Sequence, residues 1–369
     1  MKVILVSPYS EKLVGGIINW TKFIVNYHRE HGGDVDMRLL NNENAEQVMG
    51  GSGPLKRLVV GVNNYFPLCR SFKEAINMEN YDVAHICTSA SFGLIRDLLI
   101  VNTARKKGIK TCIHMHFGRI PQILDSRGWE KMLMLRLFKR VDRIVVMDMA
   151  SFNALKKAGY EKVVYLPNPL SLEVQELIEK NSQLTREPRK IVYAGHVGEN
   201  KGVFELVKAC SQISQIKLEL LGKYSTPAIK ESLFCDADKN GKEWLSIPGN
   251  KPFEDVIKEM MTCSVFVLPS YSEGFPNVIL ESMACGCPIV ATSVGAIPEM
   301  LNINGDNPCG VCVPAKDIDA LRDAIVDVLG NKEYAEDLGR KAIERVYANY
   351  TIPKVWEQIV DIWRMTALN

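Results

Sequence analysis

The sequence predicts an α/β protein of two Rossmann-like domains, each a doubly wound parallel sheet, that face each other across a cleft. One reason is length, because 369 residues exceed the roughly 250–300 at which a single hydrophobic core stops growing. The other is the repeated alternation of short apolar runs with helical segments, which is typical of parallel strands joined by crossover helices. The alternation breaks at Pro167, Asn168 and Pro169 and restarts at Ile191. We therefore expect a hinge just after Pro169.

The first domain is expected over residues 1–170. Its apolar runs predict strands, and the stretches between them predict helices that cover both faces of the sheet. The predicted strands cover residues 3–6, 83–87, 111–115, 144–147 and 163–166, and the predicted helices cover residues 17–31, 94–107 and 151–158.

The second domain is expected over residues 171–351. Its predicted strands cover residues 191–194, 218–221, 244–247, 265–268, 289–291 and 310–314, and its predicted helices cover residues 203–212, 253–261, 278–284 and 318–329. In the last segment, 352–369, large apolar side chains recur at helical spacing, among them Trp356 and Trp363. This segment predicts a helix that returns across the interface between the domains.

Composition narrows the class of protein. The formal net charge of +2 lacks the strong positive field of a nucleic-acid-binding protein, so no nucleic acid partner is expected. The N-terminus has no signal-peptide pattern, no apolar run is long enough to span a bilayer, and the ten scattered cysteines indicate a reducing compartment. We therefore predict a cytoplasmic protein. Cys309 and Cys312 have the spacing of a zinc knuckle, but without two more matched ligands we interpret them as core thiols.

Several polar features follow predicted strands, at the edge where a doubly wound sheet binds its ligand. Gly15 and Gly16 follow the first strand and open a helix, where backbone N–H groups can approach a phosphate. Gly195 and His196 follow the strand at 191–194, and Lys201 lies one loop further on. Because both side chains can carry positive charge, this loop is interpreted as an anion site.

A pair of glutamates follows the strand at 265–268. Pro276 suits the first turn of a helix, which places Glu273 in the preceding loop and Glu281 about a turn and a half into the helix. Two carboxylates facing one pocket could do acid and base work, or they could accept hydrogen bonds from sugar and ribose hydroxyls. Backbone N–H groups before and at the helix start would favour a phosphate or sugar oxygen, namely those of Gly274, Phe275 and Asn277.

These residues form a recognisable signature. Glu273 and Glu281, with seven residues between them, lie in a run that begins at Pro269 and is followed by the run from Ala284 to Thr292. The sequence resembles the retaining glycosyltransferases of the family 4 type, which have the GT-B fold, over almost the full chain. The resemblance implies an enzyme that takes a sugar from a UDP- or GDP-sugar and uses no separate cofactor.

The resemblance also implies roles for individual residues. Glu281 would bind the ribose hydroxyls, Glu273 the hydroxyls of the donor sugar, and Lys201 the diphosphate. Gly16 would approach the donor phosphate through its backbone, and His116 would lie near the donor sugar and the acceptor. The nucleotide-sugar site would further include Gly15, Gly195, His196, Gly274, Phe275, Asn277 and Val278.

Two histidines need separate treatment. His196 stands where such families usually carry an arginine, which would make diphosphate binding depend on pH. His114, close before His116, is expected to point to the opposite face of the strand and to serve the structure.

No metal ion is expected. Asp-x-Asp pairs begin at Asp34, Asp236 and Asp317, but none lies where the expected cleft needs it, and Asp317 suits a helix N-cap. The charge of the leaving group would instead be offset by Lys201, His196 and helix N-termini.

The acceptor is not defined by the motif. Basic and apolar residues are interleaved from Arg127 to Arg143, which indicates either an amphipathic helix on an anionic membrane or a core helix with a solvated basic face. Membrane contact would favour a lipid-linked saccharide over a free saccharide as the acceptor. Two other functions stay open, a nucleotide-sugar epimerase and a catalytically silent subunit that binds a nucleotide sugar.

Overall fold

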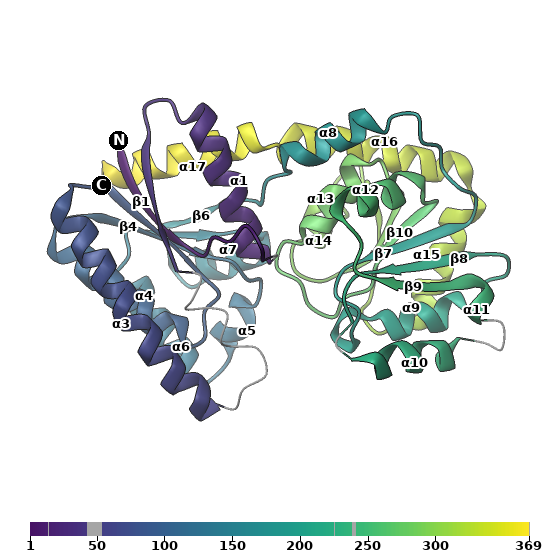
Figure 1. Ribbon diagram of the computed structural model, residues 1–369, viewed down its shortest axis with the longest axis horizontal. Coiled ribbons are helices and arrows are strands. Elements are labelled where there is room, and N and C mark those ends of the chain that lie inside the picture. The colour runs from purple at the N-terminus through teal and green to yellow at the C-terminus, as the bar shows by residue number, and fades with distance from the viewer. Residues whose placement is uncertain (14, 43–53, 225, 238–240, 369) are drawn as a thin grey trace. The chain divides into compact units, whose positions relative to one another are not determined.

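The computed structural model describes residues 1–13, 15–42, 54–224, 226–237 and 241–368. It divides the chain into two compact units (Figure 1). Unit 1 comprises Met1–Pro169 together with Ile352–Asn369, and unit 2 comprises Leu170–Thr351. The final segment of the chain therefore belongs to the same unit as the first 169 residues.

Unit 1 contains a parallel sheet of six strands in the order β2-β1-β3-β4-β5-β6. Its central strands read as continuous apolar runs because helices cover both faces of the sheet, and every residue of β3 is buried. The strands are β1 (Lys2–Ser7), β2 (Asp36–Asn41), β3 (Val83–Thr88), β4 (Lys110–Met115), β5 (Arg143–Val146) and β6 (Val163–Tyr165).

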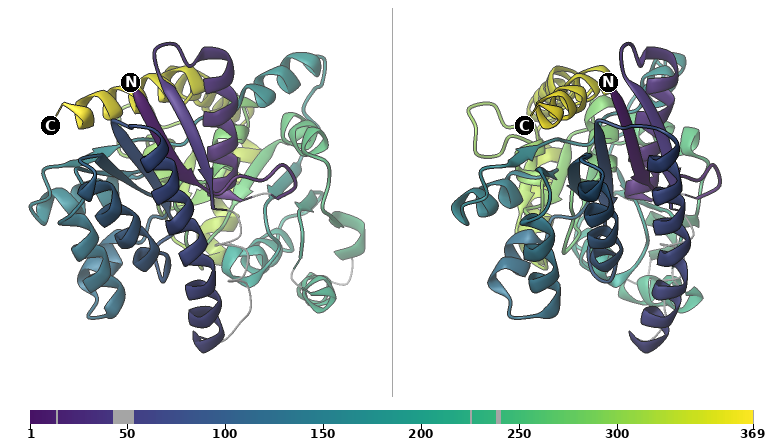
Figure 2. Two further views of the ribbon diagram at one scale, coloured as in Figure 1. Left: turned by 60° about the vertical axis from the view of Figure 1, so that its left-hand side comes forward. Right: turned by 90° about the vertical axis from the view of Figure 1, so that its left-hand side faces the viewer.

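The helices of unit 1 pack into two apolar cores, one on each face of the sheet. Helices α3, α4 and α6 contribute to one core, and α1 and α17 contribute to the other; Figures 1 and 2 show α17, in yellow, beside α1. The helices are α1 (Gly16–His31), α3 (Pro54–Met78), α4 (Gly93–Lys106), α5 (Ile120–Asp125), α6 (Trp129–Phe138), α7 (Met149–Lys157) and α17 (Ile352–Ala367).

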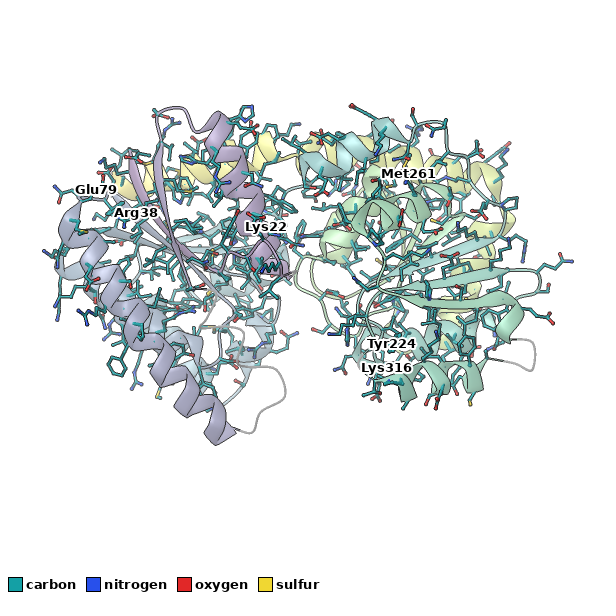
Figure 3. All side chains as sticks on the ribbon, in the orientation of Figure 1. Lys22, Arg38, Glu79, Tyr224, Met261 and Lys316 are labelled. Atoms are coloured by element: carbon teal, nitrogen blue, oxygen red, sulfur yellow. The ribbon has the colours of Figure 1, made fainter. Side chains whose placement is uncertain are left out.

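Polar contacts fix the edge of this sheet. Arg38 on β2 donates a hydrogen bond to the Tyr81 hydroxyl at 3.4 Å, and that hydroxyl donates to Glu79 at 2.9 Å; Figure 3 labels Arg38 and Glu79. Arg364 near the end of α17 forms an ion pair with Asp34 at 3.0 Å. Asp34, which opens one of the Asp-x-Asp pairs, thus has a structural partner.

Unit 2 repeats the design with six parallel strands in the order β12-β11-β10-β7-β8-β9. The strands are β7 (Lys190–Ala194), β8 (Lys217–Leu221), β9 (Leu245–Gly249), β10 (Val265–Leu268), β11 (Ile289–Thr292) and β12 (Val311–Val313). The chain leaves β7 in one direction and resumes on its other side with β10, so the switch point of the sheet lies between these two strands.

The helices and one 3-10 turn of unit 2 are α8 (Leu172–Lys180), η2 (Glu199–Lys201), α9 (Val203–Cys210), α10 (Pro227–Asp236), α11 (Gly241–Trp244), α12 (Phe253–Thr262), α13 (Asn277–Ala284), α14 (Ile297–Met300), α15 (Ile318–Gly330) and α16 (Lys332–Asn349). Asp317 is the N-cap of α15, as predicted, and its side chain accepts from the N–H of Ala320 at 2.9 Å. Asp236 ends α10, and its partner Asp238 lies outside the described residues.

Several elements differ from the sequence prediction. The prediction contains none of the helices α3, α8 and α16, and half of the residues of α16 are exposed. The basic stretch is not one helix: α6 covers Trp129–Phe138, whereas Arg143 begins β5. Among the described residues, no helix has the length and apolarity to cross a bilayer.

Candidate active site

The two loops that flank the switch point of unit 2 meet through an ion pair. Lys201 follows β7 and Glu273 follows β10, and the Lys201 Nζ lies 2.7 Å from the Glu273 Oε1. The Glu273 side chain is 13% exposed and the Lys201 side chain 32%, so the carboxylate is the better shielded of the two. The structure therefore brings together the predicted diphosphate ligand and the predicted sugar ligand.

Gly202 makes this contact between the loops possible. Its φ is +66°, and a Cβ atom there would lie 2.0 Å from the carbonyl oxygen of Pro269. The N–H of Tyr271 donates to the Asn200 carbonyl at 3.1 Å and adds a second link between the loops. A side chain at position 202 would therefore separate Lys201 from Glu273.

A third loop, after β11, holds Glu273 from the other side. Gly295 has a φ of +56°, and a Cβ atom there would lie 2.3 Å from the Glu273 carbonyl oxygen. The N–H of Ala296 donates to the Gly274 carbonyl at 2.9 Å. Gly295 was not predicted as a site residue, although a glycine just after a predicted strand is a signal that could have found it.

Helix α13 carries Glu281. Pro276 is the N-cap of this helix rather than part of its first turn, and α13 begins at Asn277. Phe275, before the cap, is buried and packs against Tyr350 with 5.7 Å between ring centroids. The loop is thus anchored to the core, and both Asn277 and Val278 lie in the first turn of α13.

The carboxyl group of Glu281 has an unusual environment. Burial raises its pKa to about 7, and the nearby carboxylate of Glu173 on α8 adds to the rise. Near neutral pH this group therefore exchanges between a carboxylic acid and a carboxylate. Glu173 was not identified from the sequence, because nothing in the spacing of 173 and 281 links them.

The loop after β7 also contains Gly195 and His196. The Tyr193 hydroxyl donates to the His196 carbonyl at 2.7 Å, which fixes the backbone of the loop. Burial raises the pKa of Tyr193, so this hydroxyl stays protonated and acts as the donor. The His196 side chain itself is exposed.

In unit 1, Gly15 and Gly16 form the N-terminus of α1. Gly15 is the N-cap in an extended conformation, and α1 starts at Gly16. No described heavy atom lies within 4 Å of a Cβ built at Gly16. Packing inside the described part of the chain does not require glycine here, so the bare backbone is available to an anion at the helix N-terminus.

His116 directly follows β4, and its environment corrects one prediction. The rings of His114 and His116 lie with their centroids 3.9 Å apart, so the expectation that His114 points to the opposite face is wrong. Residues i and i+2 of a strand share a face, and the expectation misapplied this rule. Burial lowers the pKa of His116 to about 3, which makes it a neutral imidazole.

One group of three potential metal ligands lies in the described part of the chain, formed by His85, Cys87 and His114. Its hydrogen bonds do not suit a metal. The indole N–H of Trp363 donates to His85 Nδ1 at 3.0 Å, and His85 Nε2 lies 3.2 Å from His114 Nδ1. Because an indole only donates, His85 Nδ1 accepts and Nε2 carries the hydrogen, so neither ring nitrogen has a free lone pair for an ion.

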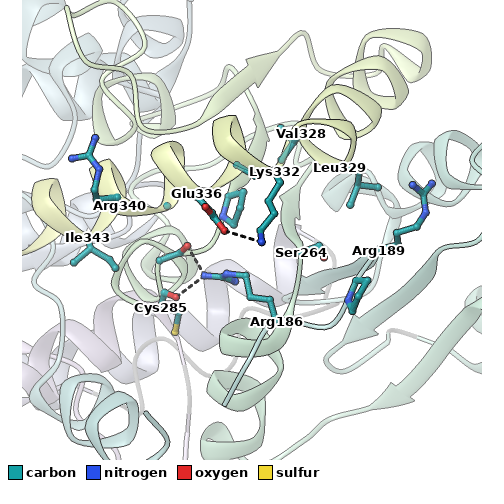
Figure 4. A pocket seen from close by; sticks show the side chains of 15 residues that line it. Arg186, Arg189, Ser264, Cys285, Val328, Leu329, Lys332, Glu336, Arg340 and Ile343 are labelled. Atoms are coloured by element: carbon teal, nitrogen blue, oxygen red, sulfur yellow. Dashed lines mark hydrogen bonds and ion pairs between the residues drawn. The ribbon is translucent and has the colours of Figure 1, made fainter. Parts of the chain in front are cut away.

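A cavity of about 670 Å³ lies elsewhere in unit 2 (Figure 4). It is lined by residues before β7, β10 and β11, including Arg189 and Ser264, and by α16. Arg186 in its wall donates to the Cys285 carbonyl at 3.0 Å. Since doubly wound sheets bind ligands at the opposite, carboxyl ends of their strands, this cavity is separate from the candidate site.

Two doubly wound parallel sheets in one chain, with glycine-containing loops after β1 and β7, define the GT-B class of fold. Solved structures have the same fold. Sucrose-phosphate synthase from Thermosynechococcus elongatus superposes with a TM-score of 0.76 at 19% identity, over 99% of this chain and 98% of that one. HepE from Anabaena, in complex with UDP, superposes with a TM-score of 0.74 at 14% identity, over 99% and 100%.

The sequence of unit 2 matches a known family. Residues 174–345, just under half of the chain, match the model of the family described as glycosyl transferases group 1. The resemblance drawn from the glutamate signature is thus confirmed for the family and for the fold.

Curated relatives match part of the chain. The capsular polysaccharide biosynthesis glycosyltransferase CapM of Staphylococcus aureus is 27% identical over 60% of this chain and 55% of its own length. The alpha-galactosylglucosyldiacylglycerol synthase of Streptococcus pneumoniae is 25% identical over 64% of this chain and 65% of its own length. The matched region therefore spans somewhat more than half of these relatives.

Proposed function

We propose that the protein is a retaining, metal-independent glycosyltransferase that moves a hexosyl group from a UDP- or GDP-sugar to a saccharide or lipid-linked saccharide acceptor. The observation that carries the proposal is the contact between Lys201 and Glu273 at the switch point of unit 2. It puts a cation for a diphosphate beside a carboxylate for sugar hydroxyls. Glu281 on the adjacent helix would bind the ribose.

The ion pair gives Lys201 two alternative partners. In the structure, its ammonium group binds Glu273 at 2.7 Å. When a nucleotide sugar binds, the diphosphate would take up the ammonium group, and Glu273 would accept hydrogen bonds from the sugar hydroxyls. Charge-assisted hydrogen bonds of both kinds exceed neutral ones in strength, so the exchange costs little.

The reaction itself needs few groups from the protein. The bond between the anomeric carbon and the β-phosphate oxygen breaks, and the acceptor oxygen bonds to the same face of that carbon. The departing phosphate takes the proton of the acceptor hydroxyl, and Lys201 together with the N–H groups at Gly15 and Gly16 would stabilise its charge. In this scheme His116 contacts the reacting sugars as a neutral imidazole.

We propose that unit 1 binds the acceptor and unit 2 binds the donor.

Helix α6 of unit 1 supports a peripheral position at the inner face of a membrane, in an otherwise cytoplasmic protein. Trp129 and Met132 are each 46% exposed, and Arg136, Lys139 and Arg140 are exposed beyond them. Aromatic and basic side chains together suit an anionic lipid surface.

The relatives support the choice of substrates. HepE is described in complex with UDP-glucose, which supports a nucleotide-sugar donor here. The pneumococcal relative is named for a glycolipid product and the staphylococcal one for capsular polysaccharide. Surface polysaccharide or glycolipid synthesis is therefore the setting that we propose.

The test is a screen of nucleotide sugars for thermal stabilisation, since a ligand at about 100 times its dissociation constant adds about 2.7 kcal/mol to the free energy of unfolding. Hits are then assayed for transfer to saccharide and glycolipid acceptors with and without EDTA. Activity that EDTA abolishes and magnesium or manganese restores would contradict metal independence.

The same screen separates the alternatives. An epimerase would convert the donor in the absence of any acceptor. A catalytically silent subunit would bind nucleotide without transfer or hydrolysis. His196 favours this alternative, because such families usually carry an arginine at that position. Acceptor-dependent release of nucleoside diphosphate contradicts both.

A further inference from the structure

A chain of buried hydrogen bonds crosses from α17 into the sheet of unit 1. The indole N–H of Trp363 donates to His85 Nδ1 at 3.0 Å, and His85 Nε2 lies 3.2 Å from His114 Nδ1. Trp363, His85 and His114 each have an exposed fraction of 0%. Water therefore does not compete for these contacts.

These hydrogen bonds allow only one assignment of the hydrogens on the two histidine rings. An indole can only donate, so His85 Nδ1 is the accepting nitrogen and the hydrogen of neutral His85 is on Nε2. That hydrogen is donated to His114 Nδ1, and the hydrogen of neutral His114 must then be on its Nε2. Trp363 thus determines the tautomers of two histidines.

The ring of His114, which ends this series of hydrogen bonds, lies against the ring of the predicted site residue His116. The centroids of the His114 and His116 rings are 3.9 Å apart at an interplanar angle of 37°. Trp20 packs edge-on against both, with centroid distances of 4.9 Å to His114 and 5.0 Å to His116. Neither ring nitrogen of His116 has a hydrogen-bond partner among the described residues, so packing against these rings is what orients it.

All three imidazoles are neutral. Burial lowers the pKa of His85 and of His116 to about 3, and it lowers the pKa of His114 well below its usual value. With no charge available to orient the rings, their orientation depends on hydrogen bonding and packing alone.

We propose that Trp363, His85 and His114 form a relay that fixes the orientation of His116, and that Trp363 is a positioning residue for sugar transfer. The functional half of this proposal depends on the proposed function, in which His116 contacts the reacting sugars. The relay also explains why the last helix of the chain carries a tryptophan with its N–H aimed into the sheet of unit 1.

The matched pair of variants is Trp363→Phe and Trp356→Phe. Both tryptophans belong to α17 and pack against each other with 5.8 Å between centroids, and both lie in the same core. No hydrogen bond of the Trp356 indole occurs among the described residues. Each variant removes an indole, but only Trp363→Phe removes a donor to the relay.

The first measurement is the nitrogen-15 NMR spectrum of the histidine rings, of which the chain has six. In the wild type, His85 and His114 should both appear as the Nε2–H tautomer. Trp363→Phe should shift the His85 and His114 nitrogen signals toward mixed tautomers, and Trp356→Phe should not. An Nδ1–H tautomer at His85 in the wild type would overturn the relay whether or not the variant folds.

The second measurement is steady-state transfer. Trp363→Phe should lower kcat by about tenfold or more relative to Trp356→Phe, and the donor KM of the two variants should agree within about twofold. The reason is that a misplaced His116 would contact the reacting sugars in the wrong geometry, which reduces turnover rather than donor binding. Equal kcat values for the two variants would overturn the positioning role. A wild type that fails to transfer sugar would contradict the proposed function instead, and its NMR spectrum would still decide whether the relay exists.

Discussion

Replacement of Glu281 by glutamine removes a carboxyl group whose charge the folded protein disfavours. Burial and the carboxylate of Glu173 raise its pKa from 4.5 to about 7. Glutamine keeps the size of the side chain and cannot ionise. Glu281→Gln should therefore stabilise unit 2 in a pH range where the wild-type side chain is forced to carry charge.

The sign and size of this effect follow from proton linkage. Between pH 4.5 and about 7 the folded protein binds more protons at this site than the unfolded chain, so stability decreases as the pH rises through that window. Each pKa unit corresponds to about 1.36 kcal/mol, which gives a full effect of about 3 kcal/mol above pH 7. Relative to the wild type, Glu281→Gln should gain nothing below pH 4.5 and most of this amount at pH 8.

The assay is urea denaturation of both proteins at a series of pH values from about 4.5 to 8, the range that Glu281 spans. Glu176→Gln on α8 is the matched control, because it removes one negative charge from an exposed side chain of the same unit. A stability difference for Glu281→Gln that does not change with pH, or that changes no more than the control, would refute the reasoning.

The same ionisation bears on ligand binding. A carboxylate can accept hydrogen bonds from both ribose hydroxyls, whereas a carboxylic acid is the poorer acceptor. Nucleotide binding should therefore release a proton from Glu281. In the wild type, this release favours binding at the upper end of the range from pH 6 to 8, and the contribution should be absent from Glu281→Gln.

Three further predictions concern Glu273, His196 and the basic residues that follow α6. Glu273→Gln should lower kcat by about 10- to 100-fold while nucleoside diphosphate binds as well or better, because Lys201 loses its competing partner; weaker diphosphate binding would contradict this. His196→Ala should weaken diphosphate binding, and His196→Arg should keep or strengthen it, because a guanidinium offers more donors to a phosphate than an imidazole does; equal affinities for wild type and His196→Ala would show that the side chain does not touch the phosphate. Reversal of Lys139 and Arg140 to glutamate should weaken binding to anionic vesicles by about 1 kcal/mol for each charge, and unchanged sedimentation would remove the membrane contact.

Much of the fold could be predicted because its strands are buried on both faces. Apolar runs such as the one at β10 (Val265–Leu268) need no partner to be recognised, and the paired alternation then indicates two doubly wound sheets. Helix α16 could not be predicted in the same way. Its exposed polar face gives little periodic signal, and its position depends on packing against α13 and α15.

The candidate site could be predicted only for residues whose position in the sequence determines their position in the fold. Glu273 and Lys201 each follow a strand, and strand ends of one sheet converge, so their contact could be anticipated. The electrostatic effect of Glu173 on Glu281 links two helices, α8 and α13, and could not be anticipated. The error at His114 has a different origin, since the rule that residues i and i+2 share a face was available from the sequence alone.

The proposed function places Lys201 against the donor diphosphate. The decisive measurement is the dissociation constant of UDP and GDP for the wild type, for Lys201→Ala, and for the control Lys208→Ala, which removes a lysine of α9 that pairs with Asp236. Lys201→Ala should weaken the preferred nucleotide by about 10- to 100-fold, as expected for loss of a hydrogen bond to a charged group, and Lys208→Ala should not change it. Equal affinities for the wild type and Lys201→Ala would contradict the proposed site.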